Sequence, residues 1–219
     1  MYAQPVFRMT AQTEVAAFID ARRFATLVVS GEAGPVAAHL PMILHRDGDG
    51  QPVMLEGHVA RANPVAAIAA AGIPALAIFQ GADAYVTPSL YLSKREHGRV
   101  VPTWNYIAAH ATGLLEIFSD AAELRTHIEQ LTDLMEDQVA APWEVSDAPG
   151  DYIDKMVCAI TGVRLRLTTL EGVRKMSQNR ADPDRVSVQQ GFTHSTDPGA
   201  RALGHEMSKG SQKAVRDMS

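Results

Sequence analysis

The feature that most constrains this fold is a series of short extended segments separated by tight turns. Residues 24–30 (FATLVVS), 35–45 and 52–59 are rich in β-branched and aromatic side chains, which is typical of strands. The turn GEAG follows the first segment and the turn DGDG follows the second. Connections this short join antiparallel neighbours. The sequence therefore predicts a three-stranded antiparallel meander.

Two further sets of elements are predicted from hydrophobic spacing and from helix-capping residues. The expected helices are 10–23, capped by Thr10; 63–71, opened by Asn63-Pro64; 120–138, opened by Asp120 with Glu123 and carrying the apolar stripe Leu124, Ile128, Leu131, Leu134 and Met135; and 152–157. The expected strands are 75–80 and 84–87, broken at Gly81; 103–118, bent at Gly113; and 159–168, followed by a hairpin at Glu171-Gly172.

Six or more strands, mostly joined by short turns, predict a mainly β fold: an antiparallel barrel with added helices. A parallel βαβ architecture is not expected, because helices and strands do not alternate regularly. The length of 219 residues suits one domain and an appendage. We expect a barrel domain over residues 1–180 and a tail of one or two weakly packed helices over residues 181–219.

Composition limits the compartment and the partners. Lys and Arg number 20 against 25 Asp and Glu, so the net charge is −5, which counts against a free-standing nucleic-acid binder. The single Cys158 leaves no disulfide pair, which indicates a reducing compartment. The first residues lack the pattern of a signal peptide, and the most apolar stretch, 65–79, is too short to span a bilayer. We expect a cytoplasmic protein.

Common catalytic and metal-binding motifs are absent from the sequence. It contains no G-x-S-x-G, no P-loop, no G-x-G-x-x-G and no H-E-x-x-H, and its eight His residues show no metal-ligand spacing. We therefore expect no metal site.

Two segments in the first half of the chain carry candidate binding residues. GHVARANP (57–64) runs from a predicted strand into a helix, where Arg61 and free N–H groups favour an anion such as phosphate. The alternative is an ordinary helix start with Arg61 as a surface cation. AHLP (38–41) places His39 in an apolar strand, either as a core residue or facing a ligand, and Pro41 favours an edge or an opening of the sheet.

Two later segments have the same mixed character. VPTWNY (101–106) sets two aromatic rings beside an amide, which suits a flat heteroaromatic ligand or an aromatic core cluster. KMSQNR (175–180) is either a solvated loop or part of an active-site mouth, since its polar side chains can bind an anion or an amide.

Taken together, these motifs resemble the PaiB-type family of FMN-binding negative transcriptional regulators. The resemblance runs in order from residue 1 to about residue 180, through FATLVV, HLPMIL, GHVARANP, FQGADAYVTPSLY, VPTWNY and KMSQNR. It implies a flavin-binding split β-barrel, a homodimer, and FMN held at the subunit interface.

The resemblance also implies the residues around FMN. Candidates near the phosphate and ribityl chain are Thr26, His39, Leu40, Pro41, His58, Arg61 and Asn63. Trp104, Asn105 and Tyr106 are candidates beside the isoalloxazine ring, and Lys175, Ser177, Gln178 and Arg180 are candidates to close the site.

Three functions remain open at this stage. The first is a negative regulator that binds DNA, for which residues 94–99 (KREHGR) are the densest basic segment, although a solvated loop explains them as well. The second is an FMN-dependent oxidoreductase that uses a reduced nicotinamide. The third is a flavin- or haem-binding module without catalysis, with His39 or His58 as an axial ligand.

Overall fold

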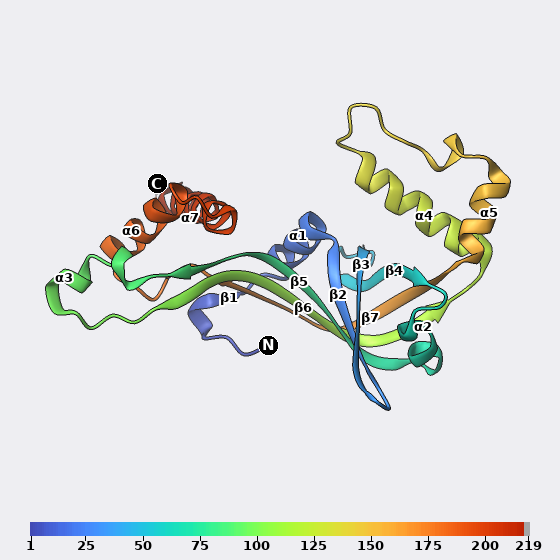
Figure 1. The fold of residues 1–219 in the computed structure, drawn as a ribbon, viewed down its shortest axis with the longest axis horizontal. Helices are drawn as coiled ribbons and strands as arrows, with labels where there is room; N and C mark the ends of the chain where they lie inside the picture. Colours follow the sequence, from blue (N-terminus) through green and yellow to red (C-terminus); the bar gives the residue numbers. More distant parts are fainter. Residues whose placement is uncertain (217–219) are drawn as a thin grey trace. The chain divides into compact units, whose positions relative to one another are not determined.

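The structure is a computed structural model and describes residues 1–216 (Figure 1). Its strands are β1 (Arg8–Met9), β2 (Phe24–Gly31), β3 (Gly34–Arg46), β4 (Pro52–Ala60), β5 (Ile73–Val86), β6 (Thr103–Phe118) and β7 (Ile160–Lys175). Its α-helices are α1 (Gln12–Arg22), α2 (Pro64–Ile68), α3 (Ser93–His97), α4 (Ala121–Glu136), α5 (Gly150–Cys158), α6 (Asp182–Thr193) and α7 (Pro198–Arg216). No helix among residues 1–216 is long and apolar enough to cross a membrane.

The predicted meander is confirmed. Strand β3 pairs antiparallel with β2, with Thr26 opposite His39, and antiparallel with β4, with Met42 opposite Gly57. Strand β3 therefore lies inside the sheet. Of the two positions that Pro41 favours, an edge or an opening, the edge was wrong. Pro41 is tolerated there because it lies opposite Phe24, where the β2 ladder begins.

The sheet closes on itself. The strand order is β1-β7-β4-β3-β2-β5-β6, and β7 pairs with β6 in addition. Gly113 on β6 permits a close approach of the two strands, because a Cβ at that position would lie 1.8 Å from the carbonyl oxygen of Arg166. The predicted antiparallel strands therefore form a closed sheet.

The chain divides into two compact units. Each of the long strands β5, β6 and β7 contributes residues to both units. One unit comprises Met1–Thr10, Gln80–Ala108 and the chain from Glu171 onward. The other comprises Ala11–Phe79 and Ala109–Leu170 and is called the barrel unit below, because it contains β2, β3 and β4. The division of the chain at residue 180 stays a prediction.

The barrel unit has two apolar clusters. Alternate residues of its strands are fully buried, among them Leu27, Met42, Leu55 and Leu165. A second cluster joins α4 and α5 to the end of β6, and consists of Phe118, Leu124, Val145, Ile153 and Val157.

The other unit, called the terminal unit below, is built around β1 and the two C-terminal helices. Met9 on β1 lies opposite Gly172 on β7, so the predicted hairpin at Glu171-Gly172 was wrong and β7 continues to Lys175. Helices α6 and α7 lie side by side (Figure 1) and bury Phe192 and Leu203. The sequence predicts one or two helices in this tail, and the structure has two there.

Three local predictions differ from the structure. Helix α1 begins at Gln12 with no side-chain cap, so Thr10 does not cap it. Strand β5 runs through Gly81 without a break. The apolar stripe of α4 includes buried Leu124 and Leu131, whereas Leu134 and Met135 are exposed near its end.

Candidate functional site

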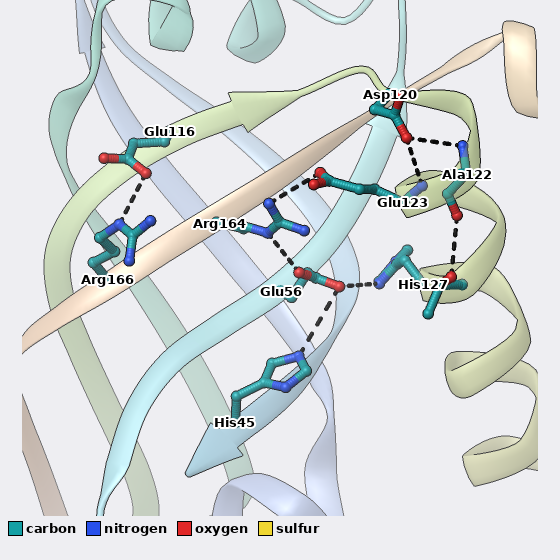
Figure 2. A network of polar contacts seen from close by, with 10 residues as sticks. His45, Glu56, Glu116, Asp120, Ala122, Glu123, His127, Arg164 and Arg166 are labelled. Carbon is teal, nitrogen blue, oxygen red and sulfur yellow. Dashed lines mark hydrogen bonds and ion pairs between the residues drawn. The ribbon is translucent and has the colours of Figure 1, made fainter. Parts of the chain in front are cut away.

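A buried carboxylate on β4 organises the polar network drawn in Figure 2. Glu56 is 5% exposed and shares one face of β4 with His58. Arg164 on β7 donates from Nε to Glu56 Oε2 at 2.7 Å, and His127 Nδ1 lies 3.1 Å from Oε1. Arg164 also donates to Glu123 at 3.2 Å. A buried charge is stable only when it is paired in this way.

Helix α4 carries His127 into this network. Asp120 accepts hydrogen bonds from the backbone N–H groups of Ala122 and Glu123, each at 3.0 Å, and so begins the helix as the sequence predicts. His127 then falls on the buried face of α4, between Leu124 and Leu131.

The network holds Glu56 ionised. Burial alone raises the pKa of Glu56, but the hydrogen bonds and positive charges of His127 and Arg164 outweigh burial and lower the pKa to about 2. The pKa of His58 is lowered by burial and by its neighbour His127.

Because ionised Glu56 can only accept hydrogen bonds, Nδ1 of His127 carries the proton of their contact. The Nε2 of His127 is an acceptor when the ring is neutral and a second donor when the ring is charged. His58 Nδ1 lies 3.0 Å from that nitrogen, and it donates to the neutral ring or accepts from the charged one. With a neutral His127 ring, Nε2 of neutral His58 keeps its lone pair, the form in which imidazole binds a metal.

A cavity of about 350 Å³ adjoins the network on the side of α4. Its walls include Glu56, Arg164, Gln130 and His45. His45 Nε2 is 4.0 Å from Glu56 Oε1, and it has no hydrogen-bond partner among the described residues.

The first set of predicted residues lies in the barrel unit. Thr26 Oγ1 and His39 Nδ1 are 3.1 Å apart across the β2–β3 ladder, at an exposed position. The ring of exposed Phe24 stacks on His39 with centroids 6.4 Å apart. Leu40 is buried and Pro41 is half-buried beside them.

Arg61 and Asn63 lie at the turn between β4 and α2. Asn63 accepts from the N–H of Val65 at 3.0 Å, so its side chain caps the helix. Helix α2 has only five residues, so its N-terminus provides little of the anion attraction that a long helix would. Arg61 is exposed and donates to the carbonyl of Ile160 at 3.3 Å.

The second set lies in the terminal unit and starts on β6. Trp104 is 52% exposed and meets the 50% exposed ring of Tyr85 edge to face, with centroids 6.1 Å apart. Asn105 is fully buried on the opposite face of the strand from Trp104 and Tyr106. Tyr106 packs against the cluster that contains Phe7.

The KMSQNR segment folds back toward β6. Asn105 Nδ2 donates to Ser177 Oγ at 3.0 Å, and Lys175 Nζ donates to Thr103 Oγ1 at 2.7 Å. Gln178 is used locally, since its Oε1 accepts from the N–H of Met176 at 2.6 Å.

A cavity of about 240 Å³ opens beside this segment. Asn105, Ser177, Lys175 and Arg180 all line it, so four of the predicted residues share one cavity. The structure thus collects the candidate residues into two groups, one in each unit.

Sequence reasoning missed the Glu56 network and part of the second cavity. A charged Glu56 within the apolar strand VMLEGHV, and a polar His127 on the apolar stripe of a helix, are the signals that could have indicated the network. Tyr91 and Thr103 in the second cavity lie within FQGADAYVTPSLY and VPTWNY, but neither was singled out as a binding residue. Among residues 1–216, no group of three or more His, Cys, Asp or Glu side chains is placed to hold a metal ion.

Known proteins resemble this chain in sequence. The sequence model of the family described as "Putative FMN-binding domain" matches residues 1–169. An uncharacterized protein of Emericella nidulans is 34% identical over an alignment of 194 positions, which covers 74% of this chain and 77% of that protein. Protease synthase and sporulation protein PAI 2 of Bacillus subtilis is 28% identical over an alignment of 218 positions, which covers 98% of this chain and 100% of that protein.

Solved structures resemble it in fold. The FAD and haem binding protein of Mycobacterium smegmatis has a TM-score of 0.57 at 20% identity, and covers 82% of this chain with 79% of its own. The flavocytochrome Anf3 of Azotobacter vinelandii has a TM-score of 0.57 at 13% identity, over 84% of this chain and 78% of that one. The predicted fold class, a mainly β antiparallel split barrel with added helices, is confirmed.

Proposed function

The chain belongs to the FMN-binding domain family that its residues 1–169 match, its cofactor is accordingly FMN, and on that premise we propose that it is a homodimeric negative transcriptional regulator of the PaiB type. The B. subtilis relative, which aligns over nearly the whole chain, supports a regulator by its role in protease synthesis and sporulation. Bound FMN would supply one- or two-electron transfer.

The main structural support for FMN binding at particular residues is the exposed aromatic pair of Trp104 and Tyr85. Large aromatic side chains that are half exposed and in mutual contact suit a flat apolar ligand, which would remove them from water. Arg61 is exposed, and its guanidinium has donors beyond the one used on Ile160, as a dianionic phosphate requires.

The remaining residues take the roles that the family resemblance implies. Around the phosphate and ribityl chain we place Thr26, His39, Leu40, Pro41, His58, Arg61 and Asn63. Beside the ring we place Trp104, Asn105 and Tyr106, and as residues that close the site Lys175, Ser177, Gln178 and Arg180.

Two variants with matched controls test this site. Arg61→Ala is expected to weaken FMN binding more than tenfold, since a bidentate charged contact contributes roughly 1.5–3 kcal/mol. Arg22→Ala, which removes an exposed cation from α1, should leave the affinity unchanged. Trp104→Ala should alter the fluorescence of bound flavin, whereas Trp143→Ala should not. Unchanged affinity in Arg61→Ala would move the phosphate elsewhere.

Repression is tested separately with promoter DNA. The basic segment Lys94–Arg99 is exposed around α3, and it is the surface that we propose contacts DNA. A mobility shift that weakens steeply as salt rises is expected, because phosphate contacts release counterions. Absence of any shift at low ionic strength would remove direct repression. FMN-dependent oxidation of NADH or NADPH by the same preparation would instead support an oxidoreductase.

One observation favours a second candidate, a flavin- and haem-binding module. With a neutral His127 ring, the Glu56–His127–His58 chain leaves the lone pair of His58 Nε2 available, as an axial ligand requires, whereas His39 Nδ1 contacts only the hydroxyl of Thr26 and is not linked to a carboxylate by any contact among the described residues. Two similar structures are named as a haem-binding protein and a flavocytochrome. A Soret band on haem titration that is lost in His58→Ala and kept in His39→Ala would support this candidate.

A further inference from the structure

The cavity of the terminal unit is positively charged and has no acid in its wall. Lys175 and Arg180 both line it, and no Asp or Glu does among the described residues. Asp184 interacts with the charge of Arg180 but does not line the cavity, and it accepts hydrogen bonds from Ser93 N at 3.0 Å and Ser93 Oγ at 2.6 Å. Among the described residues, the wall of the cavity therefore carries two cations and no carboxylate.

The ionisation of Lys175 reflects this excess of positive charge. Burial lowers the pKa of Lys175, and the charge of Arg180 lowers it further. The ammonium group contacts only neutral groups in the structure, donating to Thr103 Oγ1 and lying 5.7 Å from the ring centroid of Phe7. An anion in the cavity would relieve the repulsion between the two cations.

Tyr91 supplies an independent sign of a binding site. Its side chain is 2% exposed, it lines the cavity, and its hydroxyl has no hydrogen-bond partner within the described chain. Arg180 lies over its ring at 4.6 Å, which fixes the phenol beside a cation. Buried hydroxyl groups are nearly always paired, so an unpaired donor of this kind indicates an acceptor that binds there.

The backbone around Ser177 is held in an unfavourable conformation at the same place. Ser177 has a φ of 62°, a left-handed value that is uncommon outside glycine, and its buried hydroxyl is fixed by Asn105. Strain of this kind collects at ligand sites, where the surrounding contacts impose it.

We propose that this cavity is an oxyanion site, in which Lys175, Arg180 and the Tyr91 hydroxyl bind the phosphate group of a small molecule. Two sources can supply that group. One is FMN itself; the inference then rests on the proposed function, and the FMN phosphate binds in this cavity and not at Arg61. The other is a separate phosphate compound that binds in addition to FMN. Phe7 and the ring of Tyr91 would contact the apolar part of the ligand.

The experiment compares two variants with a control. Tyr91→Phe removes only the unpaired hydroxyl, so it should leave thermal stability unchanged or higher while it weakens phosphate binding. Lys175→Met removes one cation and should weaken binding at least tenfold. Lys155→Met, which removes an exposed lysine from α5, is the control and should change nothing.

Inorganic phosphate, FMN and riboflavin are titrated into each protein by calorimetry, with ³¹P NMR of bound phosphate. If FMN supplies the anion, Lys175→Met weakens FMN at least tenfold, leaves riboflavin unchanged, and phosphate competes with FMN. If the ligand is separate, phosphate binds saturably to the FMN-loaded protein, Lys175→Met abolishes that binding, and Tyr91→Phe weakens it without changing FMN affinity. Both results support the site.

The inference is overturned if folded Tyr91→Phe and Lys175→Met proteins bind FMN as tightly as wild type and the wild type binds no phosphate. In that result FMN binding itself survives, so the two proposals fail separately. If the wild type binds no FMN at all, the proposed function fails, and phosphate binding to the protein alone still decides whether the cavity is an oxyanion site.

Discussion

The ionisation of Glu56 makes the free energy of unfolding depend on pH in the acid range. Its pKa is lowered from 4.5 to about 2 in the folded protein, so the carboxylate stabilises the fold above pH 4.5 and that contribution is lost as the pH falls toward 2. A shift of this size corresponds to up to about 3 kcal/mol. We expect urea denaturation to show a steep loss of stability between pH 4.5 and about 2.

Glu56→Gln should be less stable than wild type at pH 6, because Arg164 keeps only Glu123 as a charged partner, and its stability should fall less steeply in that acidic window. Part of the slope remains, because the pKa values of Asp184 and Glu206 are also lowered by their hydrogen bonds and charged neighbours. Glu129→Gln, an exposed carboxyl on the same helix as His127, serves as the control and should keep the wild-type slope. Equal pH slopes in wild type and Glu56→Gln would contradict the assignment.

At the scale of elements, the contact between β6 and β7 depends on Gly113. A Cβ there would meet the carbonyl oxygen of Arg166 at 1.8 Å, and a backbone atom cannot swing aside as a side chain can. Gly113→Ala is therefore expected to cost about 3 kcal/mol or more of stability, at the upper end of overpacking effects. The change in the midpoint of chemical denaturation measures this cost.

Gly48→Ala is the matched control, since Gly48 lies in the turn after β3 and nothing would lie within 4 Å of its Cβ. It should change stability by no more than about 0.5 kcal/mol. Similar effects of the two substitutions would mean that β6 and β7 can separate without cost.

The strands were predictable because an alternation of side chains is visible along the chain itself. Residues 103–118 were predicted as one strand, and β6 has those bounds. The breaks predicted at Gly81 and Gly172 failed because hydrogen bonding to other strands outweighs the weak preference of single glycines for turns; Gly172, for instance, lies opposite Met9.

The site was less predictable than the strands, because its contacts join residues far apart in sequence. Asn105 meets Ser177, and Glu56 meets both His127 and Arg164, only after the sheet has formed. The polar KMSQNR segment and the family resemblance indicated Lys175 and Arg180 as binding residues, but neither carried information on the unpaired hydroxyl of Tyr91.

At the scale of the whole molecule, the candidate FMN residues divide between the two compact units, with Arg61 in one and Trp104 in the other. In a homodimer with FMN at the interface, one site would combine Arg61 of one subunit with the partner's Trp104. Mixing subunits of two variants distinguishes a site shared between subunits from a site within one subunit. This test needs no knowledge of the geometry of the site.

We therefore expect Arg61→Ala, which is defective in FMN affinity, and Trp104→Ala, which is altered in flavin fluorescence, to recover both properties in part when the two proteins are mixed and allowed to exchange subunits. Half of the dimers would then be mixed, and each would hold one site with both residues intact, so about a quarter of all sites should regain wild-type affinity and flavin fluorescence. If each site lies within one subunit, every site keeps one substitution and no recovery follows. Sedimentation of the mixture checks that dimers have formed, and a monomer at all concentrations would contradict the dimer itself.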